Sequence, residues 1–207
     1  MKGETEIRDV LIRNTIHLVA EGGFEKATTK AITHMDPRSA SELRMNEAYI
    51  YRLYGGKTQL YGAAFSRLDR MLIGTVEQNI VTGTELITDT KNKLYDVFQR
   101  VWRFVLGNED NCRCYIRYYY SLYFKGGSRA MHNELFGEVI EKFKPLFKDE
   151  ADVTSIMHSV FTTLLSFAIR VYDGDLEDTE TNAEHIFNVL YCMMVAYFRP
   201  EVLAMIG

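Results

Sequence analysis

Residues 40–60 read ASELRMNEAYIYRLYGGKTQL, and this stretch decides the fold. Asn46 is a residue type that caps helices, because its side-chain oxygen accepts a hydrogen bond from a free backbone amide. Glu47 follows it, where the helix dipole favours a negative charge. A Gly-Gly pair at 55–56 ends the segment, since glycine adopts the left-handed conformation that helix C-termini favour. The stretch therefore predicts a short helix over residues 47–54.

Two further helices precede this one in the sequence. Residues 5–20 place apolar side chains at helical spacing, and the glycines at 22–23 predict the end of that helix. Thr28 is a candidate N-cap, followed by a short turn over residues 29–35. Asp36 before Pro37 is a good helix start and predicts a helix to about residue 44. Three short helices, the last two joined by a tight turn, are typical of a helix-turn-helix.

In a helix-turn-helix, one helix braces against the DNA backbone and the next enters the major groove. Here the entering helix covers residues 46–54, with Ile50 and Leu53 turned inward. Hydroxyl and ammonium groups near its end are suited to phosphates, although the tyrosines alone would also suit a small core and the lysine a solvated surface. The candidate DNA-binding residues are Thr28, Arg38, Asn46, Glu47, Ala48, Tyr49, Tyr51, Arg52, Tyr54 and Lys57.

Gly23-Phe24, Thr28-Thr29 and the whole of residues 40–60 together resemble the N-terminal signature of the TetR (tetracycline-repressor-like) transcriptional regulators. The resemblance implies that Tyr51 and Lys57 contact phosphates and that residues 46–49 face bases. It also implies an all-helical C-terminal ligand-binding domain and a homodimer formed through the last two long helices.

One feature departs from the family pattern. Nineteen positions separate Ile32 from Tyr51, more than is usual in the family, so extra residues lie near positions 33–39. The insert either lengthens the bracing element, with Arg38 adding a phosphate contact, or distorts docking and weakens DNA binding.

The rest of the chain also has helical patterning, and no segment alternates apolar and polar residues over strand length. We predict an all-α chain with a helix-turn-helix DNA-binding domain over residues 1–57 and a helical ligand-binding and dimerisation domain over residues 58–207. The predicted helices of the second domain cover residues 58–81, 87–106, 110–124, a segment that Pro145 kinks or ends, 151–172 and 181–198.

Composition narrows the function further. The 207 residues carry a net charge of −4, and residues 1–60 hold nine basic against eight acidic side chains, so any DNA contact is local to that part. The longest apolar run, residues 191–198, is far too short to span a bilayer, and the N-terminus does not read as a signal peptide. Three cysteines do not make a disulfide framework. These features predict a reduced, cytoplasmic protein that does not contact a membrane.

Two sets of residues in the second domain are candidates for binding. Aromatic side chains suit a pocket for an unknown small-molecule effector, although composition alone favours core packing for them. The candidate ligand-binding residues are Trp102, Tyr115, Tyr118, Tyr119 and Phe161. The last two long helices are apolar enough to bury a second face in a dimer. The candidate dimer residues are Ile156, Val160, Leu164, Phe187, Leu190 and Met194.

No catalytic, metal or cofactor motif stands out. Gly56-Lys57-Thr58 matches the end of a phosphate-binding loop, but Tyr51 occupies the position where that motif requires its first glycine. Cys112-Arg113-Cys114 has no histidine nearby to complete a metal site. We therefore predict a non-enzyme without cofactors. The predicted function is a ligand-responsive transcriptional regulator, a repressor rather than an activator, that binds a palindromic double-stranded DNA operator as a dimer. The alternative is a helical ligand-binding or protein-interaction module whose DNA binding has degenerated.

Overall fold

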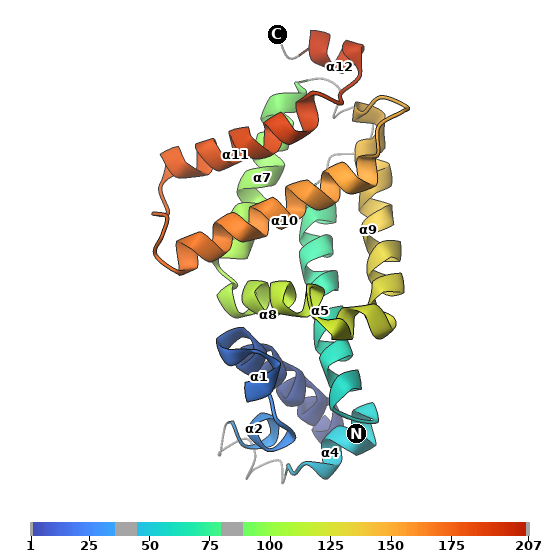
Figure 1. Cartoon of the computed structure of the whole chain (residues 1–207), viewed down its shortest axis with the longest axis vertical. Coiled ribbons are helices and arrows are strands. Elements are labelled where there is room, and N and C mark those ends of the chain that lie inside the picture. Colours follow the sequence, from blue (N-terminus) through green and yellow to red (C-terminus); the bar gives the residue numbers. More distant parts are fainter. Residues whose placement is uncertain (1, 36–44, 80–88, 206–207) are drawn as a thin grey trace. The chain divides into compact units, whose positions relative to one another are not determined.

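The structure, a computed structural model, describes residues 2–35, 45–79 and 89–205 (Figure 1). Within these ranges the chain is helical, and the only strand-like pairing is an isolated bridge between Phe147 and Phe198. The predicted all-α fold is confirmed. The described elements are α1 (Lys2–Lys26), α2 (Thr29–His34), α4 (Ala48–Tyr54), α5 (Lys57–Asn79), α7 (Thr90–Leu106), α8 (Glu109–Tyr119), η1 (Phe124–Ser128), α9 (Arg129–Phe143), η2 (Lys144–Leu146), α10 (Val153–Tyr172), α11 (Glu180–Val195) and α12 (Pro200–Ala204).

The chain divides into two compact units. Residues 1–70 and 110–132 form the first, which we call the head unit. Residues 71–109 and 133–207 form the second, which we call the bundle unit. The domain boundary predicted after residue 57 separates the chain by function, and it stays a prediction. The first compact unit extends thirteen residues further along α5, to Arg70.

The start of the head unit follows the sequence prediction in one place and differs from it in another. Helical geometry breaks at Gly23, as predicted, with φ 77° and ψ −173°, and α1 continues beyond this kink to Lys26. Residues 29–34 form the helix α2, where a short turn was expected. The Thr28 hydroxyl caps α2 by accepting from the amide of Ala31 at 3.1 Å, which stabilises a helix this short. The helix predicted over residues 37–44, and Arg38 with it, lies outside the described residues.

Buried polar contacts hold α1, α2 and α5 together. The Asn14 amide donates to the carbonyl of Ile32 at 2.7 Å, and both residues are buried. The Tyr61 hydroxyl donates to the carbonyl of Ala27 at 2.7 Å, between the end of α1 and the start of α2. Burial raises the pKa of Tyr61, so its hydroxyl stays a donor. These contacts fix the loop between α1 and α2 against α5.

The core of the head unit is aromatic. Phe65 of α5 stacks on Tyr115 and Tyr118 of α8, with ring centroids 5.0 and 4.5 Å apart. Phe124 of η1 contacts the Phe65 ring edge-on, with the ring centroids 5.5 Å apart. Both arrangements suit the ring quadrupoles, and rings of this size contribute most of the apolar area that a small core buries.

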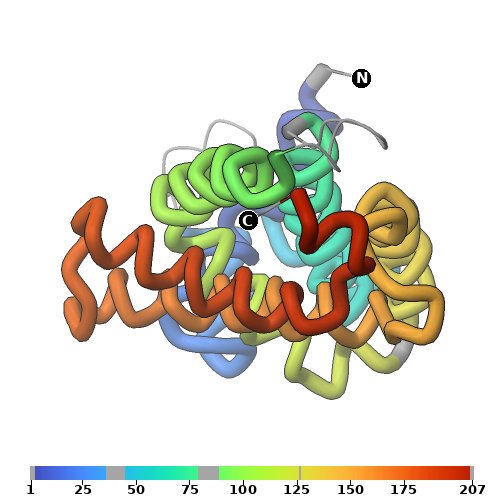
Figure 2. The backbone as a smooth tube through the Cα atoms, turned by 90° about the horizontal axis from the view of Figure 1, so that it is seen from above, coloured from blue at the N-terminus to red at the C-terminus, as the bar shows by residue number. Residues whose placement is uncertain are grey.

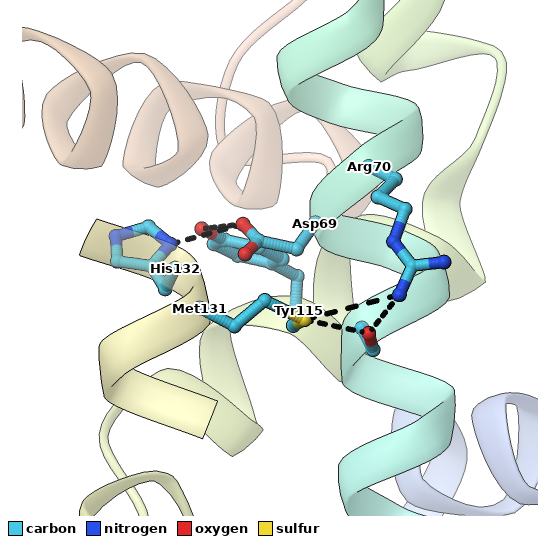
Figure 3. A network of polar contacts seen from close by, with 6 residues as sticks. Asp69, Arg70, Tyr115, Met131 and His132 are labelled. Atoms are coloured by element: carbon cyan, nitrogen blue, oxygen red, sulfur yellow. Dashed lines mark hydrogen bonds and ion pairs between the residues drawn. The ribbon is translucent and has the colours of Figure 1, made fainter. Parts of the chain in front are cut away.

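A buried polar network lies beside these rings (Figure 3). Asp69 is 0% exposed, and its Oδ1 accepts from the Tyr115 hydroxyl at 3.2 Å and pairs with His132 Nδ1 at 2.9 Å. Burial first, and then the Asp69 charge, raises the pKa of Tyr115 well above its usual value, so the phenol stays protonated. Nearby on the surface, Arg70 and Met131 share the hydroxyl of Ser66. The network joins α5, α8 and α9.

In the bundle unit, α10 packs along α11, and α7 packs against both (Figures 1 and 2). α9 ends at Phe143, and Pro145 lies in the tighter turn η2 that follows, as its missing amide predicts. Arg199 connects the end of α11 to this turn, since its Nε donates to the carbonyl of Phe147 at 2.6 Å and its Nη2 pairs with Asp149.

Candidate functional site

α4 shows the exposed and buried faces that the sequence predicts. Ile50 and Leu53 are buried against the head unit, with exposures of 0% and 9%. The Asn46 side chain accepts from the amide of Ala48 at 3.0 Å, and Gly55 closes the helix with φ 83°. The exposed residues at the start and on the outer face of the helix are Asn46, Glu47, Ala48, Tyr51 and Arg52. A narrow helix with a polar outer face is the shape that enters a major groove.

Arg8 of α1 holds α4 in place. Its Nη1 donates to the carbonyl of Leu53 at 3.0 Å, and its guanidinium lies 5.4 Å from the ring centre of Tyr54. The Tyr54 hydroxyl donates back to the carbonyl of Arg8 at 3.1 Å. Burial raises the pKa of Tyr54 against the opposing effect of the Arg8 charge. The hydroxyl of Tyr54, a candidate phosphate ligand, is therefore engaged within the head unit. The sequence analysis did not identify Arg8, because it lies among other charged residues on the polar side of α1.

The aromatic residues of α4 differ in what they touch. The guanidinium of Arg52 lies 4.3 Å from the ring centre of Tyr49, one turn earlier on the same helix. This contact orients the exposed guanidinium while the Tyr49 ring is half-buried. Tyr51 is 60% exposed, a large fraction for an aromatic residue of a short helix. Arg52 and Tyr51 are therefore the side chains on α4 with most freedom to meet a partner.

Two more polar groups border this face. Lys57 is the first residue of α5, and its Nζ lies 5.7 Å from the ring centre of Tyr61. The Thr29 hydroxyl donates to the Glu47 carboxylate, which ties the start of α4 to α2. Thr29 was not among the predicted site residues, because a contact across 18 positions has no local signal. Thr28 is exposed, with its hydroxyl occupied by the α2 cap.

The bundle unit contains an apolar cavity of about 100 Å³, open to solvent in part. Among the described residues, no lining side chain carries a hydrogen-bond donor or an ionisable group. The lining residues are Ile73, Val76, Leu94, Val97, Phe98, Val101, Phe136, Val139, Phe143, Met157, Val160, Phe161, Leu164, Phe187, Leu190 and Met194.

The structure does not bring the five predicted ligand residues together. Phe161 lines the cavity. Trp102 is buried in the bundle unit and stacks on Phe98, but does not line the cavity. Tyr115, Tyr118 and Tyr119 belong to the head unit, where the first two are buried against Phe65. Tyr115 and Tyr118 thus pack in the core, the alternative that composition favoured, while Tyr119 is half-buried and lies against Phe124.

Most predicted dimer residues face inward within one chain. Leu164, Phe187, Leu190 and Met194 are at most 6% exposed, and with Val160 they line the cavity. Ile156 is half-buried. The apolar periodicity that suggested a dimer face marks the inner side of α10 and α11, since both faces of these helices carry apolar residues and the sequence does not say which one the chain covers itself.

The cysteines do not form a reactive or metal-binding group. Cys112 and Cys114 are buried, and burial raises the pKa of Cys114 to about 12, which keeps the thiol protonated. Cys192 is exposed on α11. Within the described ranges, no three His, Cys, Asp or Glu side chains gather closely enough to hold a metal ion.

Comparison with known proteins gives one sequence match. No family model matches the chain. A 104-residue segment is 27% identical to the nucleoid occlusion factor SlmA of Mannheimia succiniciproducens, covering 50% of this chain and 43% of that protein. The chain thus matches less than half the length of this relative.

Solved structures match over almost the whole chain. A TetR family transcription regulator from Marinobacter aquaeolei has a TM-score of 0.73 at 18% identity and covers 93% of this chain and 98% of its own. A TetR-like transcriptional regulator from Rhodococcus gives 0.62 at 15% identity, covering 90% and 92%. The fatty acid degradation regulator FadR from Bacillus halodurans gives 0.55 at 17% identity, covering 88% and 96%. At these identities the matches show a shared fold, and the matched proteins are described as transcription regulators.

Proposed function

We propose that this chain, whose fold is that of the TetR-family transcription regulators, is a ligand-responsive regulator that binds a palindromic operator as a two-fold dimer. The observation that carries the proposal is α4, a capped helix whose apolar side is buried and whose outer face presents Tyr51 and Arg52 to solvent. A regulator of this kind acts on DNA in the cytoplasm, and its default role is repression, released by an effector.

Base reading is assigned to the first and middle turns of α4. An arginine donates two parallel hydrogen bonds to a guanine edge, and Arg52 is held by the Tyr49 ring in a defined orientation. Asn46, Glu47 and Ala48 lie at the exposed start of the helix and complete the base-facing set. The position of Glu47 is further restricted by Thr29.

Phosphate contacts are assigned to the ends of this face. Tyr51 offers an exposed hydroxyl, and Lys57 adds an ammonium at the N-terminus of α5, where unpaired backbone amides favour anions. Such contacts set the register on the duplex and carry no sequence information. Thr28 is assigned a contact through the exposed start of α2.

Dimerisation is assigned to the outer faces of α10 and α11. α10 has a mean hydropathy of 1.2 over eighteen residues, yet only 28% of that window is buried within one chain. Among the described helices it alone is long and apolar enough to cross a membrane by length and composition. Val189 of α11 adds an apolar side chain that is 44% exposed. A second copy of the chain would cover this surface and would place two α4 helices on two half-sites.

The cavity of the bundle unit is assigned to the effector. α5 carries Lys57 at its start and Ile73 and Val76 in the cavity wall, so one continuous helix belongs to both proposed sites. An effector can change operator binding only by its difference in affinity for the two conformations of the dimer. α5 is the element through which that difference would act.

A gel shift with DNA from upstream of the gene, repeated over a series of salt concentrations, tests the proposal. We expect a specific complex whose affinity falls steeply with salt, because each neutralised phosphate releases counterions. The alternative, a ligand-binding or interaction module without DNA affinity, is favoured by the near-balance of charge in residues 1–60. Absence of any specific complex at low salt would support that alternative.

We expect Lys57→Ala to weaken binding to all DNA sequences alike and to lower the slope of log affinity against log salt by about 1. The reason is the loss of one phosphate contact, which carries no base preference. Lys144→Ala is the matched control, since Lys144 lies on the surface of the bundle unit and pairs with Glu141. An unchanged slope for Lys57→Ala would remove Lys57 from the interface.

We expect Tyr49→Ala to change which base is preferred at one operator position, with a discrimination of about 1–3 kcal/mol at stake. The substitution removes the ring that orients Arg52. Selection from a random-sequence duplex library by wild type and variant measures the preference. Tyr120→Ala, at a tyrosine that is 71% exposed outside α4, serves as the control. Identical selected sequences for Tyr49→Ala and wild type would contradict the placement of α4.

A further inference from the structure

We infer that the effector enters the cavity of the bundle unit with an aliphatic hydrocarbon chain, and that the part inside carries no charge and no hydrogen-bonding group. This inference names the chemical class of the effector and so rests on the proposed function of the cavity.

The described part of the wall offers no strong hydrogen-bond partner to a polar group. The sixteen lining side chains that the structure describes are all apolar, and Met157 and Met194 supply only weak thioether acceptors. A hydroxyl or amide placed among them would lose its hydrogen bonds to water and gain none, a cost that weakens binding by a factor of roughly 5 to 150. A charged group would be excluded more strongly. The cavity therefore discriminates by the absence of polar atoms.

The extent of the wall suits a chain. On each of four helices the lining residues span seven positions, which is about 10 Å along a helix axis. The four spans are residues 94–101 of α7, 136–143 of α9, 157–164 of α10 and 187–194 of α11. Five of the lining residues are phenylalanine and two are methionine. Flexible methionines adapt to chains of different length.

Calorimetric titration of the full-length protein with straight-chain acids and alcohols of six to twelve carbons, below their micelle concentrations, tests the inference. We expect the dissociation constant to fall about fourfold per added methylene until the cavity is full, because each buried methylene contributes about 0.8 kcal/mol. The increment should be the same for acids and alcohols, since the chain and not the head group is enclosed. Affinity that does not depend on chain length, or depends on it for acids alone, would overturn the inference.

A dodecanoic acid with a hydroxyl at mid-chain provides the sharpest comparison. We expect it to bind at least fivefold more weakly than dodecanoic acid, because its hydroxyl would be buried without a partner. Equal binding of the two would show that the chain lies elsewhere than in this cavity.

Two variants locate the binding in the cavity. Val160→Phe should shift the best chain to a shorter length, and Phe161→Leu should shift it to a longer one. Loss of folding cannot produce opposite shifts. Val171→Phe is the matched control, at a half-buried residue of α10 outside the cavity wall. Parallel shifts in all three variants, or none, would contradict the assignment.

The titration contains no DNA, so the two proposals fail separately. If the straight-chain ligands bind as expected but do not affect the operator complex, the inference about the cavity stands and the effector role is contradicted. If a specific operator complex forms but no straight-chain ligand binds, the DNA-binding proposal stands and the inference about the cavity is contradicted.

Discussion

Asp69→Ala is expected to lower the free energy of unfolding by about 2–5 kcal/mol, because two buried side chains lose an acceptor, at roughly 1–3 kcal/mol each. Asp69 is completely buried, and its Oδ1 accepts from both Tyr115 and His132. Without the carboxylate, a phenol and an imidazole that are 2% and 3% exposed lose this acceptor. Urea denaturation followed by circular dichroism, at equal protein concentrations, measures the change.

The control for this prediction uses a carboxylate on the surface. Asp9→Ala removes an ion pair with Arg67 in which both side chains are more than two-fifths exposed, and it should change stability by less than about 1 kcal/mol. A similarly small effect of Asp69→Ala would mean that the network in Figure 3 does not stabilise the packing of α5, α8 and α9.

Val189→Arg is expected to raise the dissociation constant of the proposed dimer by a factor of about 1,000 or more. A two-fold interface repeats every substitution, so two charges would be buried on a surface that is apolar in the native chain, at a cost of several kcal/mol. Each 1.4 kcal/mol corresponds to a factor of ten. Sedimentation velocity over a range of concentrations measures the dimer, and the gel shift measures operator affinity, which should fall with it.

The matched control places the same charge elsewhere on the bundle unit. Leu203 of α12 is 38% exposed, close to the 44% of Val189, and lies outside the proposed dimer face. Leu203→Arg should leave the dimer intact. A Val189→Arg protein that dimerises as wild type does, or a monomer that binds the operator as tightly, would contradict the proposed assembly.

The residues of α4 show how far local sequence signals extend. Gly55 closure and the inward side formed by Ile50 and Leu53 appear in the structure as predicted. The Asn46 side chain accepts from an amide at the helix start, but the N-cap position is Glu47, one residue later than predicted. Each depends on residues within one helical turn, so the sequence contains all the information they need. Gly23 likewise breaks the helical geometry where predicted, with a positive φ, although α1 resumes after the kink and reaches Lys26.

Aromatic and apolar residues of the second half were placed less well. Tyr115 and Trp102 were expected to share a pocket, but they belong to different units. Leu164 and Leu190 were expected on a dimer face, but they line the cavity. Apolar spacing identifies that a helix face is covered, and it contains no information about whether the covering group is the same chain, a second copy or a ligand.

The sequence by itself determined the helical class, the outline of α4 and the resemblance of residues 40–60 to a DNA-binding signature, because caps, glycines and helical periodicity act over a few neighbouring residues. Only the tertiary structure decided the rest. The Arg8 contact with Leu53 spans 45 positions, the Asp69–His132 pair spans 63, and the cavity gathers residues from Ile73 to Met194. Such contacts form because packing brings distant faces together, and the choice of faces depends on the whole chain at once.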